Sequence, residues 1–251
     1  MDFNYRKPAH IVALIPVIIA FAIIIVSPII SFFWSAPSVQ DLQIEDYPES
    51  FRLIFEIFAL ILQLVFVVII LFVGVPLLWY LLVNKLNFKE MLDRLKLRKE
   101  GIGMAILWGV ITALIAFAII VAIGVILSQL GYDQSDTSNI PELEKIFSVP
   151  TLFILITIQP IGEEIFFRGF LLEKINSLAG KEIAILSTAI LFGIAHLSYG
   201  LVYTAAMTAV IGLIFAYVVI KTKNLYTSIV AHVLMNIGSF TIYLLGESFG
   251  F

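Results

Sequence analysis

The sequence predicts an all-α fold: a polytopic transmembrane helix bundle of about seven spans with its N-terminus in the cytoplasm. Apolar residues make up 61% of the chain and charged residues only 13%, whereas a soluble domain is about 45–50% apolar and about 25% charged. The apolar residues form runs long enough to cross a bilayer, and the loops between the runs alternate in charge. This composition excludes a soluble enzyme, a nucleic-acid-binding protein and a disordered scaffold.

Each span is justified by its length, since about 20 mainly apolar residues cross the roughly 30 Å of hydrocarbon. Backbone groups in lipid must be hydrogen bonded within their own segment, so every span is expected to be a helix. The second span is long enough to tilt or to break near residues 74–76, and the fifth is short for a span. The seven predicted spans are Ile11–Trp34, Leu53–Val83, Ile102–Leu130, Ile146–Phe170, Ile183–Leu197, Leu201–Ile220 and Leu225–Leu245.

Lysine and arginine lie almost entirely on one side of these spans. Thirteen of the fifteen are on the side of the N-terminus, and only Arg52 and Lys145 are on the other side, where the loops are acidic. Because short basic loops stay in the cytoplasm, the N-terminus is expected in the cytoplasm and the C-terminus outside the cell.

The chain is expected to have two regions. Residues 1–145 would hold three spans and the basic segment Asn84–Glu100, which would lie on the cytoplasmic surface as an amphipathic helix. Residues 146–251 would form the catalytic core, because the polar residues described next all lie there. The polar residues of the first region are expected to be structural: His10 as a solvated or headgroup-level side chain, Arg52 with Glu56 as an interfacial ion pair, and Gln63 as a hydrogen-bonding contact between helices.

Three spans of the second region carry ionisable residues at a depth where lipid makes them costly. Such a residue costs at least about 2.5–3.5 kcal/mol on insertion scales, so each one needs an explanation. At a rise of 1.5 Å per residue, Glu163, His196 and His232 lie about 16, 21 and 14 Å from the expected cytoplasmic boundary. The three groups therefore share one layer of the bilayer and are expected to meet in a single site.

Helical spacing gives these residues different roles. Glu164 and Arg168 are four residues apart and can neutralise each other, which lets Glu163 point elsewhere. His232 and Asn236, also four apart, lie on one face of the last span. The flanking residues expected to shape the site are Gln159, one turn before Glu163, Pro160, which kinks the helix, and Gly162, Gly169 and Gly193, which allow helices to approach closely.

A carboxylate, two imidazoles and an amide in a water-poor site suit hydrolysis by an activated water molecule. Glu163 would be the general base, His196 would help to hold the water or a metal, and His232 with Asn236 would donate hydrogen bonds to a developing oxyanion. A Glu–His–His zinc site remains open by ligand type. The spans contain no Gly-x-Ser-x-Gly motif, and the chain contains no His-Glu-x-x-His motif and no cysteine. Serine catalysis is therefore disfavoured, while an ordinary zincin and a cysteine nucleophile are excluded.

The ionisable residues fall into three short motifs in the fourth, fifth and seventh spans. They are Glu163-Glu164-x-x-x-Arg168, Phe192-x-x-x-His196 and His232-x-x-x-Asn236. In this order they resemble the signature motifs of the CPBP intramembrane protease family, which includes the type II CAAX prenyl endopeptidases and the bacteriocin self-immunity (Abi) proteins. The resemblance covers about Ile146–Leu245, and the first three spans resemble nothing specific.

The resemblance implies a multi-pass intramembrane endopeptidase of the plasma membrane whose catalytic cavity opens to the cytoplasm. Carried onto this sequence, it implies that Glu163 activates water with the help of His196. His232 and Asn236 would stabilise the oxyanion. The motif would be organised by Glu164 and Arg168, with Phe192 as a packing residue.

The resemblance also implies partners and a cofactor. The family is labelled a metalloprotease family, although a glutamate-activated water without tightly bound metal is also argued for its members. If a metal is used, Zn²⁺ held by Glu163, His196 and His232 is the expected cofactor. The expected partners are membrane lipid and a peptide or prenylated protein substrate.

Two other classes of function remain open at this point. A non-catalytic membrane immunity or scaffold protein would keep its effect when the polar residues are replaced. A proton-coupled transporter would use the same polar layer as a relay, but it would usually show an inverted repeat or paired broken helices, and the sequence shows neither.

Overall fold

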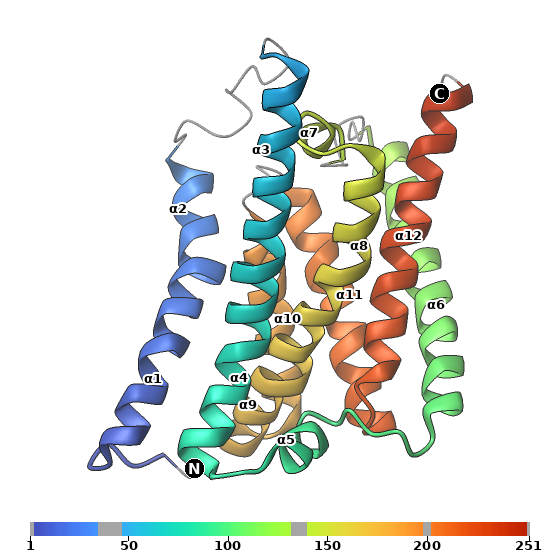
Figure 1. Cartoon of the computed structure of the whole chain (residues 1–251). Coiled ribbons are helices and arrows are strands. Elements are labelled where there is room, and N and C mark those ends of the chain that lie inside the picture. The colour runs from blue at the N-terminus through green and yellow to red at the C-terminus, as the bar shows by residue number, and fades with distance from the viewer. Residues whose placement is uncertain (1–2, 35–46, 132–139, 198–201, 250–251) are drawn as a thin grey trace.

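The computed structural model describes residues 3–34, 47–131, 140–197 and 202–249. Within these ranges every regular element is a helix and no strand occurs. Figure 1 shows the helices running side by side in one bundle. The N-terminus lies with α5 (Phe88–Arg94) at one end, and the C-terminus lies with α7 (Ile140–Glu144) at the other. The predicted all-α bundle is confirmed, and its two ends are named the α5 end and the α7 end below.

Six helices in the described ranges are long and apolar enough to cross a membrane. The predicted fifth span corresponds to α10 (Lys181–Ala195), whose 15 residues are about 22 Å long and therefore shorter than the hydrocarbon layer, as its short apolar run indicated. The protein is thus an integral, multi-pass membrane protein. The six long helices are Pro8–Phe33, Glu49–Asn84, Ile102–Gln129, Val149–Ala179, Val202–Thr222 and Tyr226–Ser248.

Three of the long helices alternate between α and π geometry without breaking. The predicted break near residues 74–76 is a change of helix type, because Gly74 and Val75 both keep right-handed helical angles. The first helix consists of α1 (Pro8–Phe21), η1 (Ala22–Val26) and α2 (Ser27–Phe33), and the second of α3 (Glu49–Ile61), η4 (Leu62–Gly74), α4 (Val75–Trp79) and η5 (Tyr80–Asn84). The fourth consists of α8 (Val149–Glu164), η6 (Ile165–Leu171) and α9 (Leu172–Ala179), and the other long helices are α6 (Ile102–Gln129), α11 (Val202–Thr222) and α12 (Tyr226–Phe249).

The fourth helix lies at the centre of the bundle. Its apolar window is 44% buried, the largest share among the six long helices. Gly162 allows it to approach η4 closely, because a Cβ there would lie only 2.8 Å from Cγ1 of Val68. Phe166, Phe167 and Phe170 of η6 are buried in the main apolar core. The close contact at Gly162 and the buried phenylalanines of η6 therefore fix the helix on either side of Glu163 and Glu164.

The basic connector is only partly helical. Within the predicted surface helix Asn84–Glu100, α5 covers seven residues and begins with a capping box between Asn87 and Glu90. Arg94 anchors α5 to the bundle, because its Nη2 lies 2.9 Å from Oε1 of Glu173 on α9. Burial lowers the pKa of Lys96, which follows α5.

Two predictions for the first region are wrong. His10 is buried, with 2% of its surface exposed, and its Nδ1 accepts a hydrogen bond from the backbone N of Asn4. In the described chain no ion pair joins Arg52 to Glu56. Oε1 of Glu56 instead accepts hydrogen bonds from the backbone N and Oγ of Ser148 at 2.7 and 2.6 Å, because the start of α8 offers unsatisfied donors beside it.

Candidate active site

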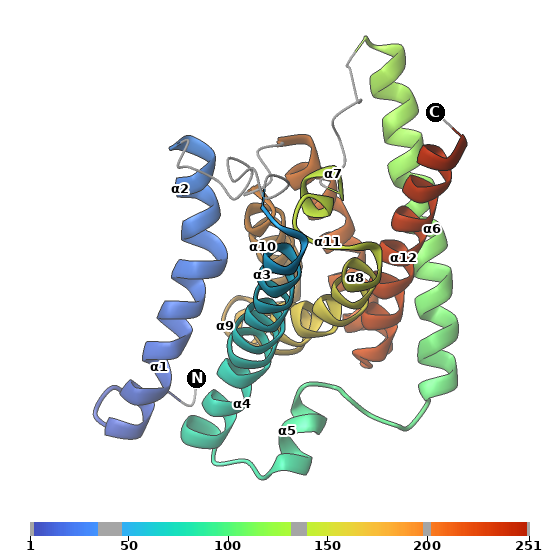
Figure 2. The ribbon, with the colours of Figure 1, turned by 45° about the horizontal axis from the view of Figure 1, so that its top comes forward.

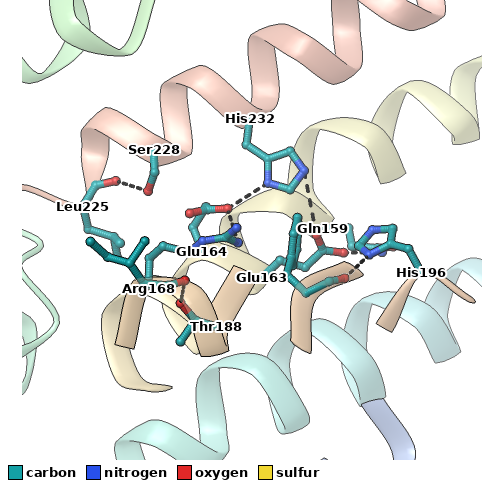
Figure 3. A network of polar contacts seen from close by, with 11 residues as sticks. Gln159, Glu163, Glu164, Arg168, Thr188, His196, Leu225, Ser228 and His232 are labelled. Atoms are coloured by element: carbon teal, nitrogen blue, oxygen red, sulfur yellow. Dashed lines mark hydrogen bonds and ion pairs between the residues drawn. The ribbon is translucent and has the colours of Figure 1, made fainter. Parts of the chain in front are cut away.

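Glu163 and Glu164 lie at the C-terminal end of α8, where the helix continues into η6. Consecutive helical residues point in directions about 100° apart, so the two carboxylates have different surroundings. Glu164 has no exposed surface, whereas 5% of Glu163 is exposed and its side chain reaches the cavity described below. Figure 3 shows both residues and their partners.

Glu164 forms a fully buried ion pair with Arg168. Nη1 of Arg168 donates to Oε1 of Glu164 at 2.9 Å, and neither side chain has any exposed surface. The guanidinium carbon of Arg168 lies 4.0 Å from the centre of the Phe192 ring and 5.6 Å from that of Phe215, a cation–π arrangement. The predicted pairing of Glu164 with Arg168 is present, and Phe192 packs as expected.

His232 contacts both glutamates. Its Nδ1 lies 3.0 Å from Oε1 of Glu164, and its Nε2 lies 3.8 Å from Oε2 of Glu163. A carboxylate paired with arginine can only accept, so Nδ1 of His232 carries a hydrogen and donates it to Glu164. The distance to Glu163 is too long for a direct hydrogen bond. Nε2 of His232 and Oε2 of Glu163 therefore face each other across a short gap.

The second oxygen of Glu163 is held by a chain of two amides. Nε2 of Gln159 donates to Oε1 of Glu163 at 2.7 Å, and Nε2 of Gln63 on η4 donates to Oε1 of Gln159 at 2.8 Å. The prediction that Gln63 bonds a neighbouring helix is confirmed. These bonds fix the orientation of the Glu163 carboxylate and leave Oε2 toward His232.

His196 stands directly after the last residue of α10. Its Nδ1 lies 2.7 Å from the carbonyl oxygen of Phe192, and because a carbonyl only accepts, Nδ1 carries the hydrogen and a neutral ring presents Nε2 as an acceptor. The centre of its ring lies 4.7 Å from that of Phe192. The motif Phe192-x-x-x-His196 therefore sets both the tautomer and the orientation of His196.

Asn236 lies one turn beyond His232 on α12, as the spacing predicted. It is half-buried, and its Nδ2 lies 3.5 Å from the carbonyl oxygen of Ile156 on α8. Two serines flank the motifs in the sequence, Ser198 and Ser228. Ser228 is buried and donates to the carbonyl oxygen of Leu225, whereas Ser198 lies outside the described residues.

A cavity of about 1380 Å³ collects the predicted catalytic residues. Its wall includes Glu163, His196, His232 and Asn236, together with Gln159. The depth argument from the sequence placed these groups in one layer, and the structure brings them to one cavity. Most of the remaining wall is aliphatic and aromatic, which suits a site inside a membrane.

The predicted zinc ligands do not form a metal site by geometry. In the part of the chain that the structure describes, no three His, Asp, Glu or Cys side chains are grouped closely enough to hold a metal ion together. Zn²⁺ remains a prediction from the family resemblance.

Sequence reasoning missed three features of the site. It assigned Gln63 only a hydrogen bond to a neighbouring helix, although this residue is connected to Glu163 through Gln159. It did not find Phe215, a buried aromatic beside Arg168 that looks like any other core residue in the sequence. It also assigned His232 to the oxyanion, or to a metal if one is used, without the bond to Glu164.

Comparison with known proteins agrees with the motifs. Residues 145–238 match the family described as type II CAAX prenyl endopeptidase Rce1-like. The chain is 36% identical over 149 residues to "Putative membrane peptidase YdiL" of Bacillus subtilis (strain 168), covering 55% of this chain and 57% of that protein. It is 28% identical over 126 residues to YyaK of the same organism, covering 48% of this chain and 42% of that protein.

The aligned segments span about half the length of these two relatives. No solved structure matches the chain. The matched region contains all three motifs and with them Gln159, Glu163, Phe192, His196, His232 and Asn236, which are called the floor of the cavity below. The resemblance seen in the sequence is therefore confirmed: residues 145–238 of this integral membrane protein are similar to the type II CAAX prenyl endopeptidase Rce1-like family, a family of membrane proteases.

Proposed function

We propose that this protein is an intramembrane endopeptidase that hydrolyses a peptide bond with a water molecule activated by Glu163. The observation that carries the proposal is the 3.8 Å gap between Oε2 of Glu163 and Nε2 of His232 at the floor of the cavity. Every other polar atom of this pair is already engaged: Oε1 of Glu163 by Gln159, and Nδ1 of His232 by Glu164. Oε2 of Glu163 and Nε2 of His232 are thus the two atoms that can act on a water molecule or substrate in the cavity.

In the first step, Oε2 of Glu163 takes a proton from the water while the water oxygen attacks the carbonyl carbon of the substrate. The hydrogen bond donated by the Gln159 amide keeps Oε1 of Glu163 occupied, so Oε2 is the oxygen that acts as base. Nε2 of His196 is an acceptor that can orient the second hydrogen of the water.

The oxyanion formed by this attack needs donors. His232, when protonated, donates from Nε2, and Glu164 stabilises the imidazolium through Nδ1. Nδ2 of Asn236 is a second donor in the same cavity wall. In the last step, Glu163 returns its proton to the leaving amine and the carbon–nitrogen bond breaks, which restores the carboxylate.

The buried pair of Glu164 and Arg168 acts through position. It keeps a negative charge next to Nδ1 of His232 without placing that charge in the cavity. Residues with this role contact other side chains and do not contact the substrate.

The test is cleavage by the purified full chain in lipid nanodiscs. Matched peptides with and without a C-terminal prenyl cysteine are incubated with the protein, and product masses give the cleaved bond. We expect endoproteolysis by the wild type and none by Glu163→Gln, with Glu100→Gln of the exposed connector as the matched control. Unchanged cleavage by Glu163→Gln would refute the assigned base.

Two further arms refine the proposal. Cleavage of the prenylated peptide alone would support a prenylated protein as substrate, and equal cleavage of both would exclude that requirement. Loss of activity in a chelator, restored by added Zn²⁺, would support the ligand set Glu163, His196 and His232, whereas full activity in the chelator would exclude it.

A further inference from the structure

A second cavity lies at the α5 end, at the opposite end of the bundle from the α7 end. Its volume is about 750 Å³, within the roughly 300–1,000 Å³ of ordinary ligand sites. Its wall is formed by the end of the basic connector, the start of α6 and the end of α11. Figure 2 shows the connector running from α5 to the start of α6. None of the described residues of this wall lines the catalytic cavity, so the two cavities are separate sites.

The wall of the second cavity is held together by Asn224, which lies between α11 and α12. Asn224 is buried, with 6% of its surface exposed, and its Nδ2 donates to the carbonyl oxygens of Arg98 and Glu100 at 3.2 and 3.4 Å. The backbone N of the next residue, Leu225, donates to the carbonyl oxygen of Lys96 at 3.0 Å. These bonds fix the connector against the turn between α11 and α12, so the cavity is a preformed part of the fold.

The wall carries an excess of positive charge. Its basic residues are Arg98, Lys221 and Lys223, and the carboxylate among its described residues is that of Glu100. Arg98 reaches the half-exposed Asp93 only at 3.7 Å, and within the described chain no carboxylate forms an ion pair with either lysine. The helix α6 also begins here without a side-chain cap and without an acidic residue in its first turn, so its dipole adds to the positive potential. The cavity therefore favours an anion.

Aromatic and apolar side chains line the same cavity at least one turn deeper in the bundle. Tyr217 precedes Lys221 by four residues on α11, and Nζ of Lys221 lies 5.4 Å from the centre of the Tyr217 ring. On α6, Met104 and Trp108 are also four residues apart and share one face. Tyr217 and Trp108 are 55% and 45% exposed, and such rings are typical of the level where lipid headgroups meet hydrocarbon. The cations thus lie at the end of the bundle and the apolar surface lies toward its middle, in the order in which a phospholipid presents its headgroup and its acyl chains.

We propose that this second cavity binds the headgroup of an anionic phospholipid. The phosphodiester lies among Arg98, Lys221 and Lys223, and the acyl chains run along Met104 and Trp108 on the surface of α6. Basic pockets between transmembrane helices are a recurring type of site for acidic headgroups. A soluble phosphate compound would use the same cations but would gain nothing from the apolar part of the wall, which favours the lipid. Lipid binding at this site does not depend on the proposed peptidase activity.

The test is lipid binding by the purified full chain in mixed detergent micelles, measured by native mass spectrometry. Phosphatidylglycerol and phosphatidylcholine with the same acyl chains are offered in equal amounts, and the apparent dissociation constant of each lipid is determined. We expect phosphatidylglycerol to bind at least about fivefold more tightly, since a single lysine near an anionic lipid surface contributes about that factor. Equal binding of the two lipids would overturn the proposal.

The double variant Lys221→Gln/Lys223→Gln removes two cations from the wall and should weaken binding of phosphatidylglycerol more than about fivefold, with no effect on phosphatidylcholine. Lys85→Gln/Lys89→Gln is the matched control, because these exposed lysines of the connector do not line the cavity, and Lys85 shares the left-handed backbone of Lys223 (φ of 56° and 53°). Its affinity should stay within about twofold of the wild type, because solvent screens exposed charges outside the cavity. Equal losses in both double variants would show a diffuse attraction in place of a site.

Glycerol phosphate, which has the same phosphoryl chemistry without acyl chains, distinguishes a lipid from a soluble ligand. We expect a large excess of glycerol phosphate to leave bound phosphatidylglycerol in place. Displacement of the lipid would show that a soluble phosphate compound is the ligand and would overturn the assignment to a phospholipid. Because none of these measurements uses a peptide substrate, a failed cleavage assay would refute the proposed function and leave the lipid site intact.

Discussion

Nε2 of His232 lies 3.8 Å from Oε2 of Glu163, while Nδ1 of the same ring lies 3.0 Å from Oε1 of Glu164. One imidazole thus contacts two adjacent carboxylates that have different surroundings. Glu163 reaches the cavity, and Glu164 is fully buried against Arg168. Substitution of the two glutamates is therefore expected to have different consequences.

Glu163→Gln should abolish cleavage and leave the fold intact. Glutamine keeps the shape and can still bond Gln159, but it cannot accept a proton, and loss of a general base lowers rates by about 10²–10⁴-fold. Initial cleavage rates and thermal unfolding of the purified variant are the measurements. A variant that unfolds at a much lower temperature than the wild type would show that the carboxylate has a structural role instead.

Glu164→Gln should destabilise the protein, because it leaves the Arg168 guanidinium buried without its anionic partner. Breaking a buried pair costs about 3–5 kcal/mol. The double variant Glu164→Gln/Arg168→Met should lose less than the sum of the two single variants, measured by denaturant unfolding in detergent micelles. Additive losses would contradict the pairing.

The exposed pair of Lys181 and Glu182 provides the control for this cycle. Its atoms are 3.3 Å apart, but the side chains are 59% and 78% exposed. Solvent screens such a pair, so Lys181→Met and Glu182→Gln should leave the unfolding midpoint unchanged.

Gln63→Leu should lower the turnover number without raising the Michaelis constant to the same extent. The substitution removes the donor that holds Gln159, and Gln159 in turn holds Oε1 of Glu163. A misoriented base affects the transition state more than substrate binding, so we expect a loss of about tenfold in the turnover number, within the range of general-base effects. Gln129→Leu at the end of α6 is the matched control, and equal effects of both variants would show that Gln63 has no positioning role.

The residues of the motifs could be assigned from the sequence because their spacing and depth are local properties of helices. The pairing of Glu164 with Arg168 follows from a separation of four residues, and the structure contains it. The seven predicted spans also correspond to helices of the structure. Their ends differ by at most four residues, except that the fourth helix continues nine residues beyond Phe170 to Ala179.

The contacts that join different helices could not be assigned in this way. Gln63 and Gln159 are 96 residues apart, and only the packing of η4 against α8 brings their amides together. The predicted bond between Arg52 and Glu56 failed for the same reason, since the donors of Ser148 at the start of α8 are available to Glu56 only after folding.

Gly193→Ala should lower both stability and activity. A Cβ at Gly193 would lie 2.6 Å from the carbonyl oxygen of Ala205 and 2.8 Å from Cβ of Ala209, so α10 and α11 would have to move apart. Overpacking of this kind costs about 1–3 kcal/mol. Because His196 directly follows α10, the same displacement should move its ring relative to Glu163 and reduce the cleavage rate.

Gly103→Ala is the matched control, since a Cβ at this position of α6 would have no neighbour within 4 Å. Alanine is the better helix former, so stability should be unchanged or rise by no more than about 1 kcal/mol, and cleavage should be unaffected. Thermal unfolding and initial cleavage rates of both variants in the same nanodiscs distinguish the two cases. If Gly193→Ala behaved like Gly103→Ala, the close contact between α10 and α11 would not be what positions His196.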